Sequence, residues 1–168
     1  MIERRTRPVR AAVTIVVAIA AAALLTMALA KEIRRPDNAH CLPVEQSIVD
    51  AIASRSTARP IAPTAAVAVR DPWIAATASV PFANYYAVAM RFTTADGETA
   101  YGVWGLGTDA ARSQDGSAVG FGSGRSGLVG VDDAARIWTD WPPGTDMPFA
   151  AEGTSVVRAK QCLDLVDR

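Results

Sequence analysis

The segment GSGRSG at 122–127 has the glycine spacing G-x-G-x-x-G, in which exposed backbone amides can bind a phosphate or another anion. A dinucleotide site needs this motif between a strand and a helix, with an acidic residue about 20 positions further on. Here an apolar, strand-like run follows, and Asp146 fits that position poorly. We therefore expect a flexible hairpin loop. The functional alternative is an anion site formed by Gly122, Gly124, Arg125 and Gly127.

Three aspartates, Asp132, Asp133 and Asp140, have side chains that can bind Ca²⁺ or act as a carboxylate pair in hydrolysis. Acidic residues are also favoured at the start of a helix, where Asp132 would be a good cap. We expect this structural role and no metal site. His40 is the single histidine of the chain, which leaves little for a zinc cluster or a Ser-His-Asp triad. No cofactor is expected.

The two cysteines, Cys41 and Cys162, stand near the two ends of the region that follows residue 40. Two cysteines in an exported chain indicate one disulfide. A disulfide that closes a loop of this length stabilises the folded state by roughly 4–5 kcal/mol in the chain-entropy model. The alternatives are two inert thiols and a reactive thiol beside His40. A nucleophile needs an oriented base, which an adjacent residue rarely supplies. We predict the disulfide.

Four tryptophans, Trp73, Trp104, Trp138 and Trp141, are many for 168 residues. Core packing accounts for them. The functional alternative is a hydrophobic groove or Trp-lined pocket that binds a peptide, a lipid or another small ligand.

Residues 11–30 form an uncharged run that, as a helix, spans a bilayer core of about 30 Å. A basic tail at 1–10 precedes it, and a charged stalk at 31–40 follows. The positive-inside rule then predicts a cytoplasmic tail and an extracytoplasmic domain at 41–168. We expect an uncleaved single-pass anchor in the cell membrane. Secretion after cleavage at Ala30 is the alternative, because the run ends in an A-x-A pattern.

The clearest strand signal is a hairpin, in which bulky residues alternate at period two over 85–92 and a return strand runs over 99–106. Asp96-Gly97 suits a two-residue type I′ turn. That turn would place Phe92 opposite Tyr101 and Met90 opposite Val103. The second face would carry the mostly small residues Ala87, Ala89, Gly102 and Trp104, against which a helix can pack closely.

The remaining pattern is an antiparallel sheet flanked by an N-terminal and a C-terminal helix, which is an α+β domain. Pro43 suits the first position of the first helix, Asp71-Pro72 separates two strands, and Asp132 caps a short helix. We expect helices at 43–54, 133–141 and 154–166, a loop at 56–63, further strands at 65–70, 73–79, 118–122 and 127–131, and a polar loop at 107–117.

The chain resembles the small exported or membrane-anchored proteins of actinobacteria that have no known activity. The resemblance rests on the Arg-rich start, the Ala-rich span, the two cysteines, the strand at 101–104 and the stretch VDDAARIWTDW at 131–141. It implies an extracytoplasmic location and transfers no active-site residue.

The charge balance, 17 basic against 17 acidic side chains, leaves no basic stripe of the kind that nucleic-acid binding needs. The expected function is a non-enzymatic domain that binds a protein partner or supports an envelope or transfer-machinery assembly, with the membrane bound through 11–30. The alternatives are a small-ligand or lipid-binding domain and a secreted carboxylate-dependent hydrolase.

The predicted topology is checked by the intact mass of the protein from its native host, alkylated without reductant. We expect a full-length chain without alkyl groups, because an exported cysteine pair is oxidised. A full-length chain that carries two alkyl groups would contradict the extracytoplasmic location.

Overall fold

The computed structural model describes residues 40–110 and 118–166. The predicted tail, the predicted membrane segment at 11–30 and all of the stalk except His40 lie outside these ranges. Within them, no helix is both long enough and apolar enough to span a bilayer.

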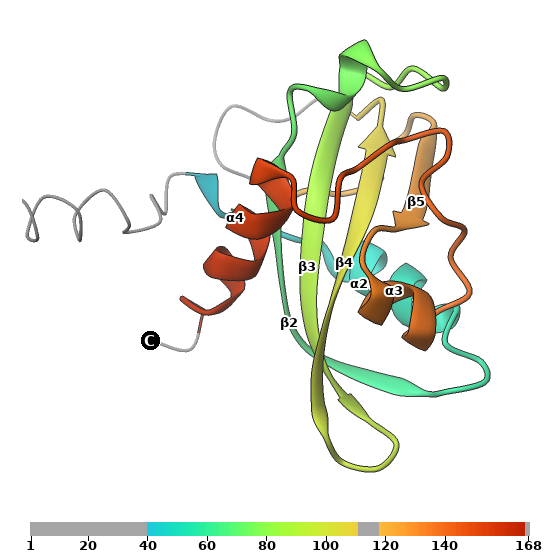
Figure 1. Cartoon of the computed structure of the whole chain (residues 1–168), viewed down its shortest axis with the longest axis vertical. Coiled ribbons are helices and arrows are strands. Elements are labelled where there is room, and N and C mark those ends of the chain that lie inside the picture. The colour runs from blue at the N-terminus through green and yellow to red at the C-terminus, as the bar shows by residue number, and fades with distance from the viewer. Residues whose placement is uncertain (1–39, 111–117, 167–168) are drawn as a thin grey trace, which may run out of the picture. The chain divides into compact units, whose positions relative to one another are not determined.

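A five-stranded antiparallel sheet is the centre of the domain, and its strands follow one another in chain order (Figure 1). Sequential order needs no crossover connection, so each strand pairs with its neighbour in the chain. The predicted α+β class, with a helix near each end, is confirmed. The strands are β1 (Leu42–Pro43), β2 (Ile61–Arg70), β3 (Asn84–Thr94), β4 (Thr99–Thr108) and β5 (Ser126–Gly130), and the helices are α2 (Gln46–Ser54), η2 (Ile74–Ala76, a 3-10 turn), α3 (Asp133–Trp138) and α4 (Thr154–Leu163).

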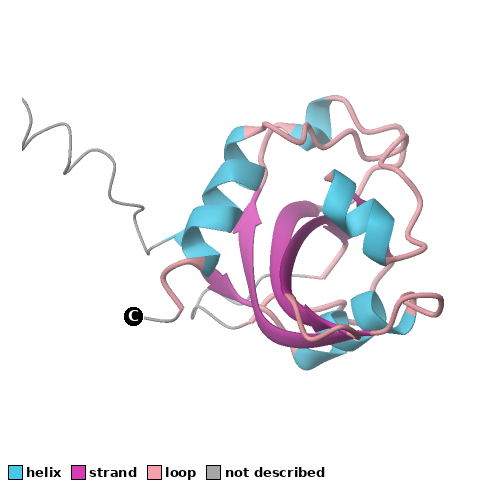
Figure 2. Ribbon diagram, turned by 60° about the horizontal axis from the view of Figure 1, so that its bottom comes forward, coloured by secondary structure: helices cyan, strands magenta, loops and turns pink. Residues whose placement is uncertain are grey.

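Each face of the sheet carries its own hydrophobic core. Figure 1 shows α4 in front of β2 and β3 and α2 behind the sheet, and Figure 2 shows how strongly the strands curve between them. The core behind the sheet packs α2 and α3 against the bulky face of β3. The core in front packs α4 against Ala87 and Ala89, so the predicted close approach of a helix to these small residues is confirmed.

The β3–β4 register differs by one residue from the prediction. Phe92 pairs with Ala100, not with Tyr101, and Met90 pairs with Gly102, not with Val103. The cause is the turn, which has three residues between its flanking pair and not two. Gly97 has φ 82°, donates its N–H to the carbonyl of Thr94, and so forms a type I turn followed by a glycine bulge.

This one-residue shift moves the side chains of β4 to the opposite face, because strand side chains alternate. Trp104 therefore lies with Met90 and Phe92 in the core behind the sheet, while Val103 faces α4. The prediction that Trp104 and Gly102 share a face with Ala87 is wrong.

The predicted helix at 43–54 begins three residues later, at Gln46. Leu42 and Pro43 pair with β2 as a short edge strand, where a proline is tolerated because the outer side needs no ladder hydrogen bond. The predicted loop at 56–63 also ends earlier, since β2 already starts at Ile61.

Two predicted strands are absent from the described residues. The segment at 73–79 forms η2, because the Asp71 side chain accepts hydrogen bonds from the N–H groups of Trp73 and Ile74 and turns the chain. The segment at 118–122 makes one isolated bridge, between Val119 and Val44. The strand predicted at 127–131 is present as β5.

The last two helices are shorter than predicted. Asp132 caps α3 as expected, accepting from the N–H of Ala135, but α3 ends at Trp138. Thr139 is extended there, and its hydroxyl bonds the carbonyl of Ala135. Helix α4 ends at Leu163, so Val166 is 55% exposed and not part of the buried face.

Trp104 is the largest fully buried side chain, and Gly102 makes room for it. The Trp104 indole N–H donates to the hydroxyl of Thr139 at 3.1 Å, which fixes the ring. A Cβ atom on Gly102 would lie 2.5 Å from Cη2 of Trp104. Since the ring cannot move without losing that hydrogen bond, the position excludes any side chain.

We predict that Gly102→Ala lowers the free energy of unfolding by about 1–3 kcal/mol, the usual cost of overpacking a core. Chemical denaturation of the full chain measures it. Gly127→Ala is the matched control in the neighbouring strand, because its Cβ would meet no atom closer than 3.4 Å. Equal stability losses in the two variants would contradict this packing.

Candidate functional site

A hollow in the described part of the chain lies between the end of β2, η2 and the first turn of α4. Its volume is about 440 Å³, which is in the range of small-molecule sites. We call it the cationic pocket because three of its residues are basic. It is lined by His40, Leu42, Val69, Arg70, Pro72, Trp73, Thr154, Ser155 and Arg158.

Asp71 connects the segments that line the cationic pocket. It is only 9% exposed, and its backbone N–H donates to the carbonyl of Tyr85 at 2.8 Å. One carboxylate oxygen accepts from the N–H groups of Trp73 and Ile74, and the other accepts from the hydroxyl of Ser155. One buried residue therefore links β3, through its backbone N–H, with η2 and α4, through its carboxylate.

Two arginines give the pocket its positive charge. Arg70 is exposed at the end of β2, and Arg158 is half-buried one turn into α4. Neither forms an ion pair with another described residue. A guanidinium presents five N–H donors in a planar fork, so both can bind an anion in two contacts. His40 also lines the pocket.

The apolar part of the pocket consists of an open rim and a buried floor. Trp73 is 79% exposed at the rim, the highest value among the large hydrophobic residues that are exposed. Leu42 and Val69 are buried and form the floor. An exposed indole beside a hollow is a favourable surface for an apolar or planar group.

The predicted disulfide between Cys41 and Cys162 is present, with 5.6 Å between the two Cα atoms. Cys41 lies between the pocket residues His40 and Leu42, and Cys162 lies in α4 one turn after Arg158. The bond joins the start of the domain to the helix that forms the opposite wall of the pocket.

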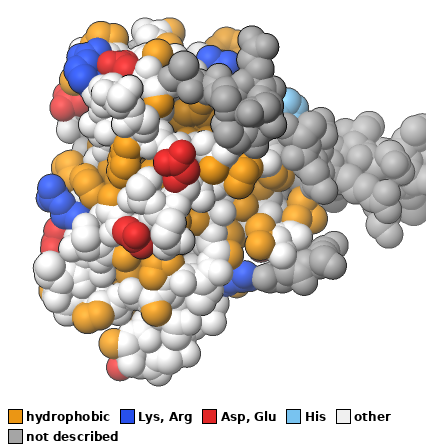
Figure 3. All heavy atoms as spheres, turned by 180° about the vertical axis from the view of Figure 1, so that it is seen from behind, with side chains coloured by type: hydrophobic (Ala, Val, Ile, Leu, Met, Phe, Trp, Pro, Cys, Tyr) orange, Lys and Arg blue, Asp and Glu red, His pale blue; other side chains and the backbone are white. Residues whose placement is uncertain are grey.

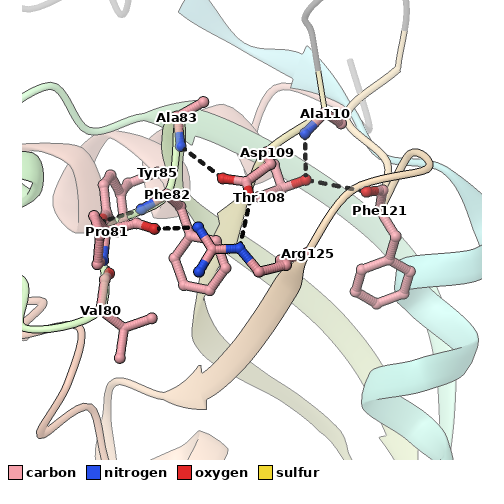
Figure 4. Close-up of polar contacts among 10 residues, drawn as sticks. All are labelled: Val80, Pro81, Phe82, Ala83, Tyr85, Thr108, Asp109, Ala110, Phe121 and Arg125. Carbon is pink, nitrogen blue, oxygen red and sulfur yellow. Dashed lines mark hydrogen bonds and ion pairs between the residues drawn. The ribbon is translucent and has the colours of Figure 1, made fainter.

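The predicted anion loop at 122–127 contains an arginine that is already neutralised (Figure 4). The Nε atom of Arg125 lies 2.9 Å from the Asp109 carboxylate, and its Nη2 donates to the carbonyl of Pro81 at 3.0 Å. Gly122 has φ +61° as a turn requires, and Gly127 lies inside β5 opposite Gly107. The contacts of Arg125 therefore attach the loop to neighbouring segments at one end of the sheet.

The three aspartates singled out in the sequence each make hydrogen bonds or ion pairs within the domain. Asp132 accepts from the N–H groups of Val103 and Ala135 and pairs with Lys160 at 2.9 Å. Asp133 pairs with Arg136 at 3.4 Å, and Asp140 accepts from the hydroxyl of Thr57. In residues 40–110 and 118–166, no three side chains gather as a metal site would require.

Of the four tryptophans, Trp73 alone lines the cationic pocket. Trp138 and Trp141 are half-buried against the core behind the sheet. The guanidinium of Arg59 lies 5.8 Å from the ring centre of Trp138, and that of Arg55 lies 4.5 Å from the ring centre of Trp141. Core packing therefore explains three of the four.

Sequence reasoning missed Arg70, Asp71 and Arg158 as site residues. The pair Asp71-Pro72 was recognisable as a turn, in which an aspartate side chain commonly accepts hydrogen bonds from the amides that follow it. No signal in the sequence indicated that α4 would bring Arg158 to the same place.

Comparison with protein-family models, with curated proteins and with solved structures found no match.

We predict that Asp71→Ala lowers the free energy of unfolding by roughly 2–4 kcal/mol, because it leaves three buried or half-buried donors unsatisfied. Thermal unfolding measures this loss. Asp71→Asn keeps an acceptor for the two backbone amides and should lose less, and Ser155→Ala removes one bond and should cost about 1 kcal/mol. An alanine variant as stable as the natural protein would contradict the linking role of Asp71.

Proposed function

We propose that this chain is a membrane-anchored extracytoplasmic domain that binds a ligand and catalyses no reaction, and that the cationic pocket is its binding site. The observation that carries the proposal is a pair of arginines, Arg70 and Arg158, that form no ion pair with another described residue and lie beside the exposed indole of Trp73 over one hollow. The ligand that fits is an anion with an apolar part.

The charge of the pocket favours an anion. Among the described residues no acidic side chain lines it, and the carboxylate of the neighbouring Asp71 is engaged by three hydrogen bonds. Arginine side chains without a carboxylate partner in a partly enclosed site attract an anion more strongly than they would in open water.

The location outside the cytoplasm is supported by two independent features. A disulfide forms and persists in oxidising compartments, and the pair Cys41–Cys162 is at bonding distance. The uncharged run at 11–30 supplies the predicted anchor.

A hydrolase is less well supported, because a carboxylate pair needs at least one oxygen free for the substrate. Asp132, the best placed of the three candidates, uses both oxygens on backbone amides and Lys160.

A protein partner is the second candidate, and the envelope or transfer-machinery role belongs with it. Ile137 is 55% exposed beside Trp138, and a smaller hollow of about 210 Å³ opens between them and Arg59. On the face opposite to the view of Figure 1, hydrophobic side chains gather in small groups separated by polar ones (Figure 3). The ligand pocket therefore remains the better-defined site.

We predict that hexanoate, an anion with a short apolar tail, saturates a change in Trp73 fluorescence of the full chain in phosphatidylcholine nanodiscs. Arg70→Glu and Arg158→Glu should each weaken binding at least about fivefold, because each replaces an attraction by a repulsion. The variant Trp73→Phe measures the background, because its tryptophan fluorescence comes from the other three tryptophans.

Arg59→Glu is the matched control, since it reverses the charge of an arginine outside the pocket and should change the affinity by less than about twofold. Equal affinity in all three charge-reversal variants, or no saturable signal, would overturn the proposal.

A further inference from the structure

We infer that the ligand of the cationic pocket is a phosphate monoester joined to an apolar group. The inference rests on the proposed function and specifies the class of anion. It is carried by the number and kind of hydrogen-bond donors that surround the hollow, together with the apolar surface that adjoins them.

The donors outnumber what a carboxylate can accept. Arg70 and Arg158 offer five N–H groups each, and Thr154 at the start of α4 offers a hydroxyl. A carboxylate carries one negative charge on two oxygens. A phosphate monoester carries about −1.5 to −2 charges at pH 7 on three terminal oxygens, so it satisfies more of these donors and balances two arginines.

The first turn of α4 adds to the same charge preference. Gly153 caps the helix without a side-chain hydrogen bond, and no acidic residue occupies the first turn. Helix α4 therefore places no acidic side chain of its own beside Thr154 and Ser155, which both line the pocket, and the Asp71 carboxylate that accepts from Ser155 is the acidic group there. This contribution supplements the two arginines and would not define a site without them.

The apolar part of the ligand is indicated by the other half of the lining. Trp73 at the rim and Leu42 and Val69 in the floor offer the ester substituent a hydrophobic surface that inorganic phosphate would leave uncovered. Covering such a surface is favourable by about 25 cal/mol per Å².

Two sources can supply this chemistry, a lipid with a terminal phosphate and a soluble phosphate ester. His40 lines the pocket. It lies ten residues after Ala30, where the predicted anchor ends. An extended chain of that length reaches at most about 36 Å. The predicted tether therefore keeps the pocket within reach of the membrane surface, where a lipid phosphate is concentrated.

The test compares hexyl phosphate, hexanoate and inorganic phosphate on the full chain in phosphatidylcholine nanodiscs, with Trp73 fluorescence as the readout. Hexyl phosphate should bind at least about tenfold more tightly than hexanoate, because of its extra charge and acceptor oxygen. It should also bind at least about tenfold more tightly than inorganic phosphate, because of its tail.

Calorimetry on the variants separates the two contributions. Trp73→Ala should remove most of the advantage of hexyl phosphate over inorganic phosphate, whereas Arg158→Glu should weaken both at least about tenfold. Arg59→Glu is again the charge control. Adding phosphatidate to the nanodiscs assigns the source. Weaker apparent binding of hexyl phosphate would indicate that a lipid phosphate occupies the pocket, and unchanged binding would indicate a soluble ligand.

The outcomes distinguish this inference from the proposed function. Hexanoate that binds as tightly as hexyl phosphate would overturn the phosphate assignment and leave an anion pocket in place. Failure of every anion to bind would overturn both.

Discussion

The packing of α4 on the front of the sheet is the constraint on which the rest of the domain depends. Val156, Ala159 and Leu163 are buried against β2 and β3, where Ala87 and Ala89 leave room for a helix. Polar and covalent links then fix the helix at its start, middle and end. These are the Asp71–Ser155 hydrogen bond, the Asp132–Lys160 ion pair and the disulfide of Cys162.

The same packing creates the cationic pocket. Arg158 and the first turn of α4 come from one end of the described chain, while Arg70 and Trp73 come from its first half. Asp71 bonds both parts, so the positions of the two arginines relative to the indole are set by a buried hydrogen-bond network and not by flexible surface contacts. A pocket preformed in this way loses little conformational freedom when a ligand binds.

Local patterns predicted the parts of this fold that local physics determines. Period-two alternation identified β3, the capping aspartate identified α3, and the two cysteines indicated the bond that closes the domain. The register of β3 and β4 was not predictable from Asp96-Gly97, because the same dipeptide suits a two-residue turn and the three-residue turn with Gly97 as its bulge. The pocket was even harder to predict from the sequence, because it depends on where α4 meets β2. That long-range contact is not encoded by any local pattern.

The most direct measurement is hydrogen–deuterium exchange of the full chain in nanodiscs, with and without hexyl phosphate. Binding in the cationic pocket predicts slower exchange in peptides that cover 70–76 and 154–158, and unchanged exchange over the glycine loop at 122–127. Slower exchange at 122–127 alone, or no change anywhere, would contradict the assignment of the binding site to the junction of β2, η2 and α4.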